Sequence, residues 1–77
     1  MELDEEKIDR AVLALLYLGL HDGYRAWKRF DWGAMSRLHE KGYITDPVGK
    51  AKSVAFTDEG LLESCKLLEE LFGSQDK

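Results

Sequence analysis

The sequence is poor in cysteine and in long apolar runs, and each shortage excludes a class of protein. Its single cysteine cannot form an internal disulfide and favours a reducing compartment. The most apolar run, residues 11–20, is about half as long as a helix that spans a bilayer. The N-terminus is acidic, whereas a secretory signal begins with basic residues. We therefore expect a cytoplasmic protein that does not enter a membrane.

The length of the chain limits its domain organisation. Its 77 residues suffice for one small domain, here taken as residues 1–77 with flexible ends at 1–5 and 73–77. A composition of 44% hydrophobic and 34% charged residues is typical of a globular chain. A domain of this size buries only about 60% of its unfolded surface, so we expect marginal stability.

Two apolar helices are predicted near the ends of the chain. Apolar residues recur with helical spacing over residues 6–20, and Thr57 is a suitable N-cap for a helix over residues 58–72. Both helices are apolar nearly all round, which exceeds what one small core can cover. The excess predicts a homodimer formed through the first and last helices. The expected interface residues are Val12, Leu16, Leu20, Leu61, Leu68, Leu71 and Phe72.

A third helix and a hairpin are predicted between these two. Asp31 is a good N-cap for a helix over residues 32–41, and Gly42 is suited to its C′ position. Trp32, Met35, Leu38 and His39 share one face of that helix. Residues 43–44 and 53–56 then predict two short strands joined by a basic turn.

Residues 24–30 are ambiguous. The rings of Tyr24, Trp27 and Phe30 recur every third residue, which fits either a two-turn helix or a structured loop. Cations separate the rings, and aromatic side chains can stack on bases of nucleic acid. The alternative is that the rings anchor the core while the cations are solvated.

Charge is distributed unevenly along the chain. Residues 1–20 hold two basic and five acidic side chains, and residues 54–77 hold two and six. Residues 21–53 hold seven basic and four acidic side chains, a net charge of +3. This basic middle segment could present a positive face to phosphate, although clustering by chance explains it equally well.

Two segments of the chain resemble known regulators. They are L-H-E-K-G-Y-I, from Leu38 to Ile44, and V-A-F-T-D-E-G-L, which starts at Val54. They are similar to winged-helix regulators of the multiple-antibiotic-resistance-repressor and phenolic-acid-repressor types (MarR and PadR). The resemblance covers about residues 31–62. The whole chain also resembles a small bacterial family of unknown function built around W-K-x-F-D-W and K-G-Y-I-x-D-P-V-G-K-A-K-S-V.

The resemblance implies an α+β, mainly helical, winged-helix-like fold, with three to four helices and a two-stranded β-hairpin wing. It implies a dimeric DNA-binding transcriptional regulator with a recognition helix at 32–41, a wing at 43–56 and a dimerisation helix at 58–72. The alternative is a protein-interaction module or accessory subunit that binds no nucleic acid. The residues expected to contact double-stranded DNA are Arg25, Lys28, Arg29, Gly33, Ser36, Arg37, Lys41, Lys50 and Lys52.

The sequence predicts no catalytic, metal or cofactor site. Cys65 falls on the apolar stripe of the last helix, which predicts a small core residue rather than a nucleophile. His21 and His39 are not spaced as metal ligands, and Asp46 to Lys50 lacks the pattern of a phosphate-binding loop.

Overall fold

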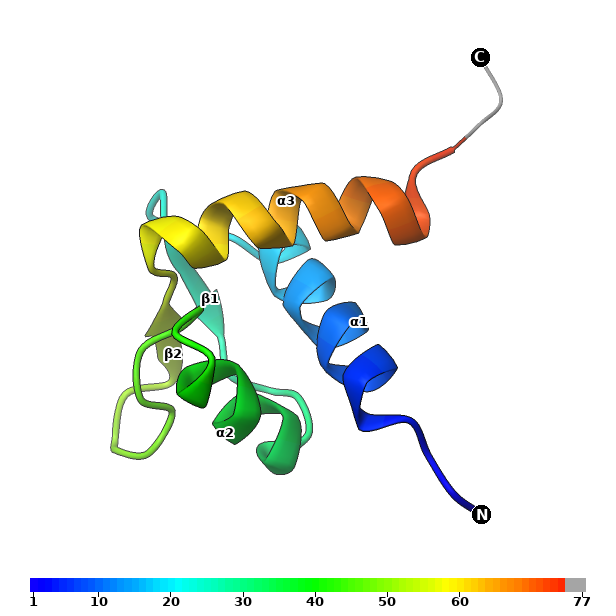
Figure 1. Ribbon diagram of the computed structural model, residues 1–77. Coiled ribbons are helices and arrows are strands. Elements are labelled where there is room, and N and C mark those ends of the chain that lie inside the picture. The colour runs from blue at the N-terminus through cyan, green and yellow to red at the C-terminus, as the bar shows by residue number, and fades with distance from the viewer. Residues whose placement is uncertain (75–77) are drawn as a thin grey trace.

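The protein is an α+β, mainly helical molecule. Its computed structural model describes residues 1–74, which form three helices and one two-stranded antiparallel sheet (Figure 1). This confirms the expected class, while part of the tail predicted to be flexible, residues 75–77, lies outside the described range. The elements in order are α1 (Glu5–Leu18), β1 (Arg25–Trp27), α2 (Trp32–Glu40), β2 (Ser53–Ala55) and α3 (Asp58–Phe72).

All three helices begin at a side-chain cap. The carboxylates of Asp4 and Asp31 accept hydrogen bonds from backbone N–H groups at the starts of α1 and α2, and the Thr57 hydroxyl does so for α3. These bonds satisfy N–H groups that have no partner within the helix. The predicted helices are therefore confirmed to within about two residues. Glu5, which was expected in a flexible end, is the first residue of α1.

Residues 24–30 contain a strand, which corrects both the helix and the loop interpretations. In the sheet Arg25 lies opposite Ala55 and Trp27 lies opposite Ser53. The small Ala26 is buried between two exposed neighbours, the alternation of a strand with one covered face. The three-residue spacing of the aromatic rings also fits a helix, so the alternation of the strand was not recognised in the sequence.

The predicted hairpin forms only in part. Ile44 and Phe56 make an isolated antiparallel bridge, and the N–H of Thr45 donates to the carbonyl of Ala55 at 2.8 Å. The ladder partner of β2 is instead β1, from a distant part of the sequence. Because β1 and β2 are not joined by a short hairpin turn, no turn motif in the sequence marks their pairing.

The two motifs noticed in the sequence meet at one junction. Gly42 adopts φ +83°, and the N–H groups of Gly42 and Tyr43 donate to the carbonyls of His39 and Leu38, which closes α2 as a Schellman motif. Thr57 donates its N–H to the Tyr43 carbonyl at 3.0 Å and its hydroxyl to the Gly42 carbonyl at 2.6 Å. K-G-Y-I therefore ends α2 where the T-x-E-G segment begins α3.

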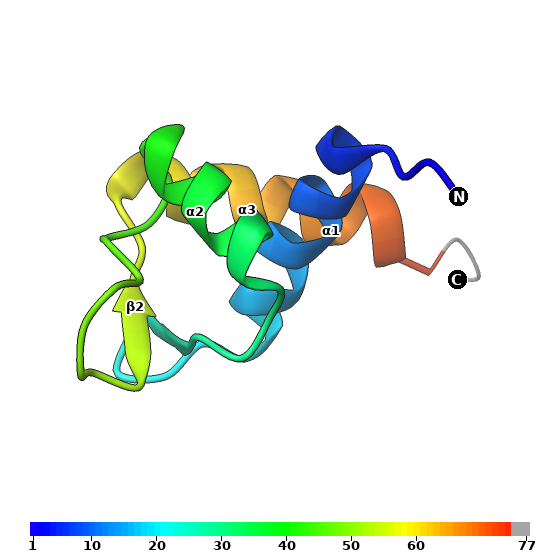
Figure 2. The ribbon, with the colours of Figure 1, turned by 90° about the horizontal axis from the view of Figure 1, so that it is seen from below.

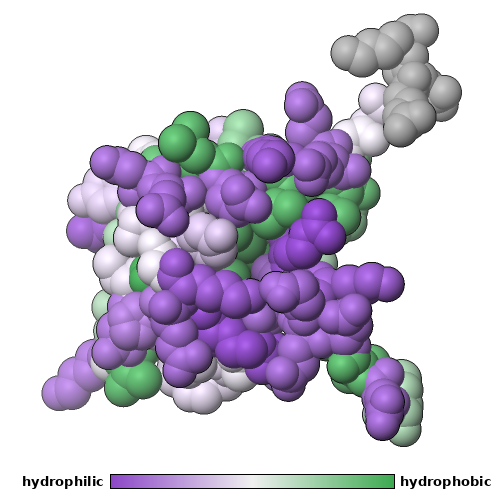
Figure 3. Space-filling view, viewed as in Figure 1, coloured by the Kyte–Doolittle hydropathy of each residue, from purple (hydrophilic) through white to green (hydrophobic). Residues whose placement is uncertain are grey.

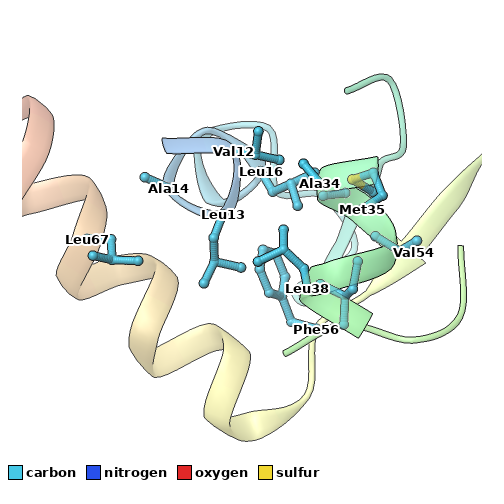
Figure 4. Packing of buried hydrophobic residues seen from close by; sticks show 12 residues of the cluster. Val12, Leu13, Ala14, Leu16, Ala34, Met35, Leu38, Val54, Phe56 and Leu67 are labelled. Carbon is cyan, nitrogen blue, oxygen red and sulfur yellow. The ribbon is translucent and has the colours of Figure 1, made fainter. Parts of the chain in front are cut away.

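The core lies between α1, α2, α3 and the inner face of the sheet. Leu13 of α1 points toward Leu38 of α2, with Leu67 of α3 nearby (Figure 4). The sheet lies at one end of the molecule, and the N-terminus and the end of α3 lie at the other (Figure 2). The molecule measures 42 × 36 × 19 Å, so it is flat and its faces are large relative to its core.

Several residues differ from their predicted burial. Trp32 and His39, expected on the buried face of α2, are exposed, and Ala34 completes that face with Met35 and Leu38. Cys65, expected in the core, is exposed on α3. On α3 the buried stripe is rotated by about one residue from the predicted one.

Candidate functional site

Arg37, expected to face a DNA groove, joins α2 to α1. Its Nε and Nη2 donate to the two carboxylate oxygens of Asp9 at 2.7 and 2.8 Å, and its Nη1 lies 3.3 Å from Glu5. Hydrogen bonding to Asp9 is the largest cause of a raised pKa of Arg37. Because Asp9 is only 2% exposed, the bidentate pair satisfies a buried carboxylate.

Lys41 is also held by acidic residues of α1. Its Nζ lies 3.3 Å from Glu6 and 3.6 Å from Asp9. Together with Glu5 and Arg37 these residues bring three acidic and two basic side chains together, a net charge of −1. Hydrophilic side chains spread over the region of α1 and α2 (Figure 3). This side of α2 therefore presents balanced charge rather than a positive surface, although Gly33 and Ser36 are exposed there.

Lys28, expected to contact phosphate, instead forms hydrogen bonds to the loop that precedes β2. Its Nζ donates to the carbonyls of Pro47 at 2.5 Å and of Gly49 at 3.1 Å, and it lies 5.9 Å from the centre of the Trp32 ring. The carboxylate of Asp46 accepts from the N–H of Val48 within the same loop. The W-K-x-F-D-W and D-P-V-G-K segments are thus bound to each other.

The remaining basic residues that were predicted to contact DNA are Arg25, Arg29, Lys50 and Lys52. All four are exposed, and none forms an ion pair with a residue in the range 1–74. They lie on β1, just after it, or in the loop before β2. These residues remain available to an anionic partner.

An apolar surface extends over α1 and α3. Along the outward side of α3 the exposed residues Leu62, Cys65, Glu69 and Phe72 follow one another at spacings of three, four and three. Leu62 is 75% exposed and Phe72 is 52% exposed. Such spacing is typical of the contact seam between paired helices.

A groove of about 560 Å³ lies beside this seam. Leu15 and Leu18 of α1 form one wall, and residues of α3 that include Cys65, Leu68 and Phe72 form the other. Leu18, the last residue of α1, is 70% exposed. We call this groove, together with the outward side of α3, the α1–α3 face.

The expected dimer residues divide into three groups. Val12 and Leu16 are buried in the core of their own chain, so their assignment to an interface is wrong. Leu20, Leu61 and Leu68 are partly buried against that core. Leu71 and Phe72 are exposed. Sequence reasoning missed Leu18 and Leu62. The spacing of Leu18 from Leu15 on the first helix, and of Leu62 from Phe72 on the last, was visible in the sequence.

Cys65 of α3 and Tyr17 of α1 interact across the α1–α3 contact. Hydrogen bonding to Cys65 is the largest cause of a raised pKa of the Tyr17 phenol. This interaction therefore favours the protonated phenol.

The fold and these surfaces define a small, mainly helical protein whose α2 charges are paired internally and whose α1–α3 face is apolar and open. The chain belongs to a small bacterial family described as "Domain of unknown function (DUF6429)", which matches residues 4–74. It is 60% identical over 72 residues to "Uncharacterized protein y4hR" of Sinorhizobium fredii, covering 94% of this chain and 97% of that protein. The expected membership of a small family of unknown function is confirmed.

No solved structure matches the chain. Across residues 1–74, no helix is both long and apolar enough to cross a membrane.

Proposed function

We propose that the protein is a cytoplasmic protein-interaction module that forms a homodimer through the α1–α3 face. The observation that supports this is the exposure of Leu18, Leu62 and Phe72 on two helices that pack firmly together. Large apolar side chains gathered on rigid elements typically mark a protein interface. A partner that covers them removes apolar area from water without reorganising the fold.

A second copy of the chain fits this face for two reasons. The groove lies between α1 and α3, and the outward ridge of α3 that carries Leu62 runs beside it, so two copies related by a twofold axis can each insert a ridge into the other's groove. Lys66 and Glu69 are exposed with opposite charge along that ridge. In an antiparallel pair of α3 helices each lysine can face the partner's glutamate.

Light scattering after size-exclusion chromatography tests the proposal. We expect the wild type to elute with twice the mass of one chain and Leu62→Glu to elute as a monomer, because the carboxylate would be buried at the interface. The matched control is Leu3→Glu, since Leu3 is a 65% exposed leucine that precedes α1. A dimer that persists in Leu62→Glu, or a monomeric wild type, would overturn the proposal.

Binding of duplex DNA, which the winged-helix resemblance implies, has less support from the geometry. A strand precedes the expected recognition helix, whereas a helix-turn-helix has a helix there, and Arg37 and Lys41 are paired with acidic residues. Binding of duplex DNA therefore stays a prediction. Anisotropy titration with duplex DNA at about 50 and 200 mM salt tests it, since phosphate contacts weaken steeply over that range.

A further inference from the structure

The strand β1 presents a tryptophan that the sheet leaves uncovered. Trp27 is 48% exposed, and its cross-strand neighbour is the small Ser53. Arg25, two residues away on the same side of the strand, lies opposite Ala55. Small residues across the ladder leave both long side chains accessible from solvent.

The ring of Trp27 is held in position from one side. His21 stacks against it with ring centres 4.5 Å apart and an angle of 28° between the planes. A bridge between His21 and Arg25 fixes the backbone beside this stack. A ring that is already oriented loses little conformational freedom when a second flat group binds to it.

A small cavity of about 190 Å³ adjoins Trp27. It lies between the end of α1 and the segment that follows β1, and its lining includes Gly19, Trp27, Arg29 and Phe30. The cavity is apolar apart from the single cation of Arg29. It therefore offers aromatic surface for a flat ring and one positive charge at the same place.

Cations outnumber acidic side chains around Trp27. Arg25 and Arg29 make no ion pair within residues 1–74, and the bond from the Lys28 N–H to the Lys52 carbonyl brings Lys52 to the end of the same ladder. Among the acidic residues of the middle segment, Asp31 and Asp46 already accept backbone hydrogen bonds. Asp22 lies at 3.5 Å from His21.

We propose that this surface, the Trp27 platform (Arg25, Trp27, Arg29 and Lys52), binds single-stranded nucleic acid. An unpaired base stacks on Trp27 beside the cavity, and the arginines contact the flanking phosphates. A single strand is the ligand because only unpaired bases expose their faces to an aromatic side chain. The proposal does not depend on the homodimer.

The test uses the fluorescence of Trp27 in a Trp32→Phe variant, in which Trp27 is the only tryptophan. Short oligothymidylate and oligouridylate are titrated at several salt concentrations. We expect saturable quenching, with a slope of log affinity against log salt of about −0.7 for each phosphate contact. Arg29→Ala should make the slope shallower by about 0.7. Comparing the two oligomers shows whether DNA or RNA binds more tightly.

A second variant tests stacking separately from charge. Trp27→Leu, followed by the anisotropy of a labelled oligomer, should weaken binding about tenfold, because loss of one stacked base has roughly that effect. Circular dichroism establishes that this variant folds, and Trp27→Phe keeps a ring if it does not. Lys7→Ala, which removes an exposed cation of α1, is the matched control and should bind as the wild type does.

Three results would overturn the proposal. They are the absence of saturable quenching at low salt, unchanged affinity in both Trp27→Leu and Arg29→Ala, and tighter binding of duplex DNA than of either single strand. The last result would favour the duplex prediction instead.

Discussion

At the scale of single residues, Gly60 stands where the first turn of α3 crosses the backbone of Tyr43. A Cβ atom on Gly60 would lie 1.9 Å from the Tyr43 carbonyl oxygen, and the obstructing atoms belong to the backbone. Gly60→Ala must therefore separate α3 from the end of α2. We expect a loss of about 3 kcal/mol in the free energy of unfolding, measured by urea denaturation.

Gly19→Ala is the control for that substitution. Its Cβ would meet only the Leu16 carbonyl oxygen at 3.8 Å, and the φ of Gly19 is −94°. We expect a change within about 0.5 kcal/mol of zero. Equal losses in the two variants would show that the contact with Tyr43 is not what requires glycine at position 60.

Tyr17 gives the fold a dependence on alkaline pH. Contact with Cys65 raises its pKa above the usual value near 10.0, so the folded protein holds the phenolic proton more tightly than the unfolded chain does. This contribution to stability is complete below the unfolded pKa and is lost as pH rises through the folded pKa.

Cys65→Ala removes the cause of that shift. The part of the tyrosinate absorbance that Tyr17→Phe eliminates belongs to Tyr17. We expect this part of the ultraviolet titration to move to lower pH in Cys65→Ala. Coinciding titration curves for wild type and Cys65→Ala would contradict the assigned contact.

The buried carboxylate of Asp9 was within reach of the sequence but was missed. Asp9 falls on the same helical face as Val12, Leu13 and Leu16, where a charge needs a buried partner. That partner, Arg37, is 28 positions away, and no local pattern specifies it. The residue could be suspected from the sequence, whereas the pair required the fold.

At the scale of elements, Lys28 couples β1 to the loop before β2. Lys28→Met removes its bonds to the Pro47 and Gly49 carbonyls while keeping an unbranched side chain. We expect faster amide hydrogen exchange over residues 46–52 and a loss of about 1 to 2 kcal/mol in stability. Lys50→Met, in the same loop, should leave exchange unchanged, and equal effects of the two variants would refute this role of Lys28.

The helices were predictable and the sheet was not, for a physical reason. A helix is stabilised by contacts between near neighbours and by its own caps, so Asp31, Thr57 and Gly42 marked its ends in the sequence. β1 consists of three residues whose pairing depends on β2. Nothing within residues 24–30 encodes that partner, so their rings suggested a helix or a loop.

At the scale of the whole molecule, the flat shape explains why apolar residues remain at the surface. Apolar excess on the first and last helices was evident from the sequence. The sequence could not decide which side of each helix faces the core, and Val12 and Leu16 were consequently placed on the wrong side. The structure assigns the excess to Leu18, Leu62, Leu71 and Phe72.

A homodimer makes thermal stability depend on protein concentration. We expect the melting temperature of the wild type to rise by a few degrees for each tenfold increase in concentration, because association favours the folded state by mass action. The melting temperature of Leu62→Glu should stay constant. A wild-type melting temperature independent of concentration would contradict folding coupled to association.

Isotope-filtered nuclear Overhauser spectroscopy on a mixture of labelled and unlabelled chains detects the proposed homodimer interface itself. Only protons of different copies give signals in this experiment. A dimer through the α1–α3 face should give contacts between the Phe72 ring of one copy and the methyl groups of Leu18 or Leu62 of the other. The absence of contacts between copies, or contacts confined to Trp32 and Val48, would contradict dimerisation through the α1–α3 face.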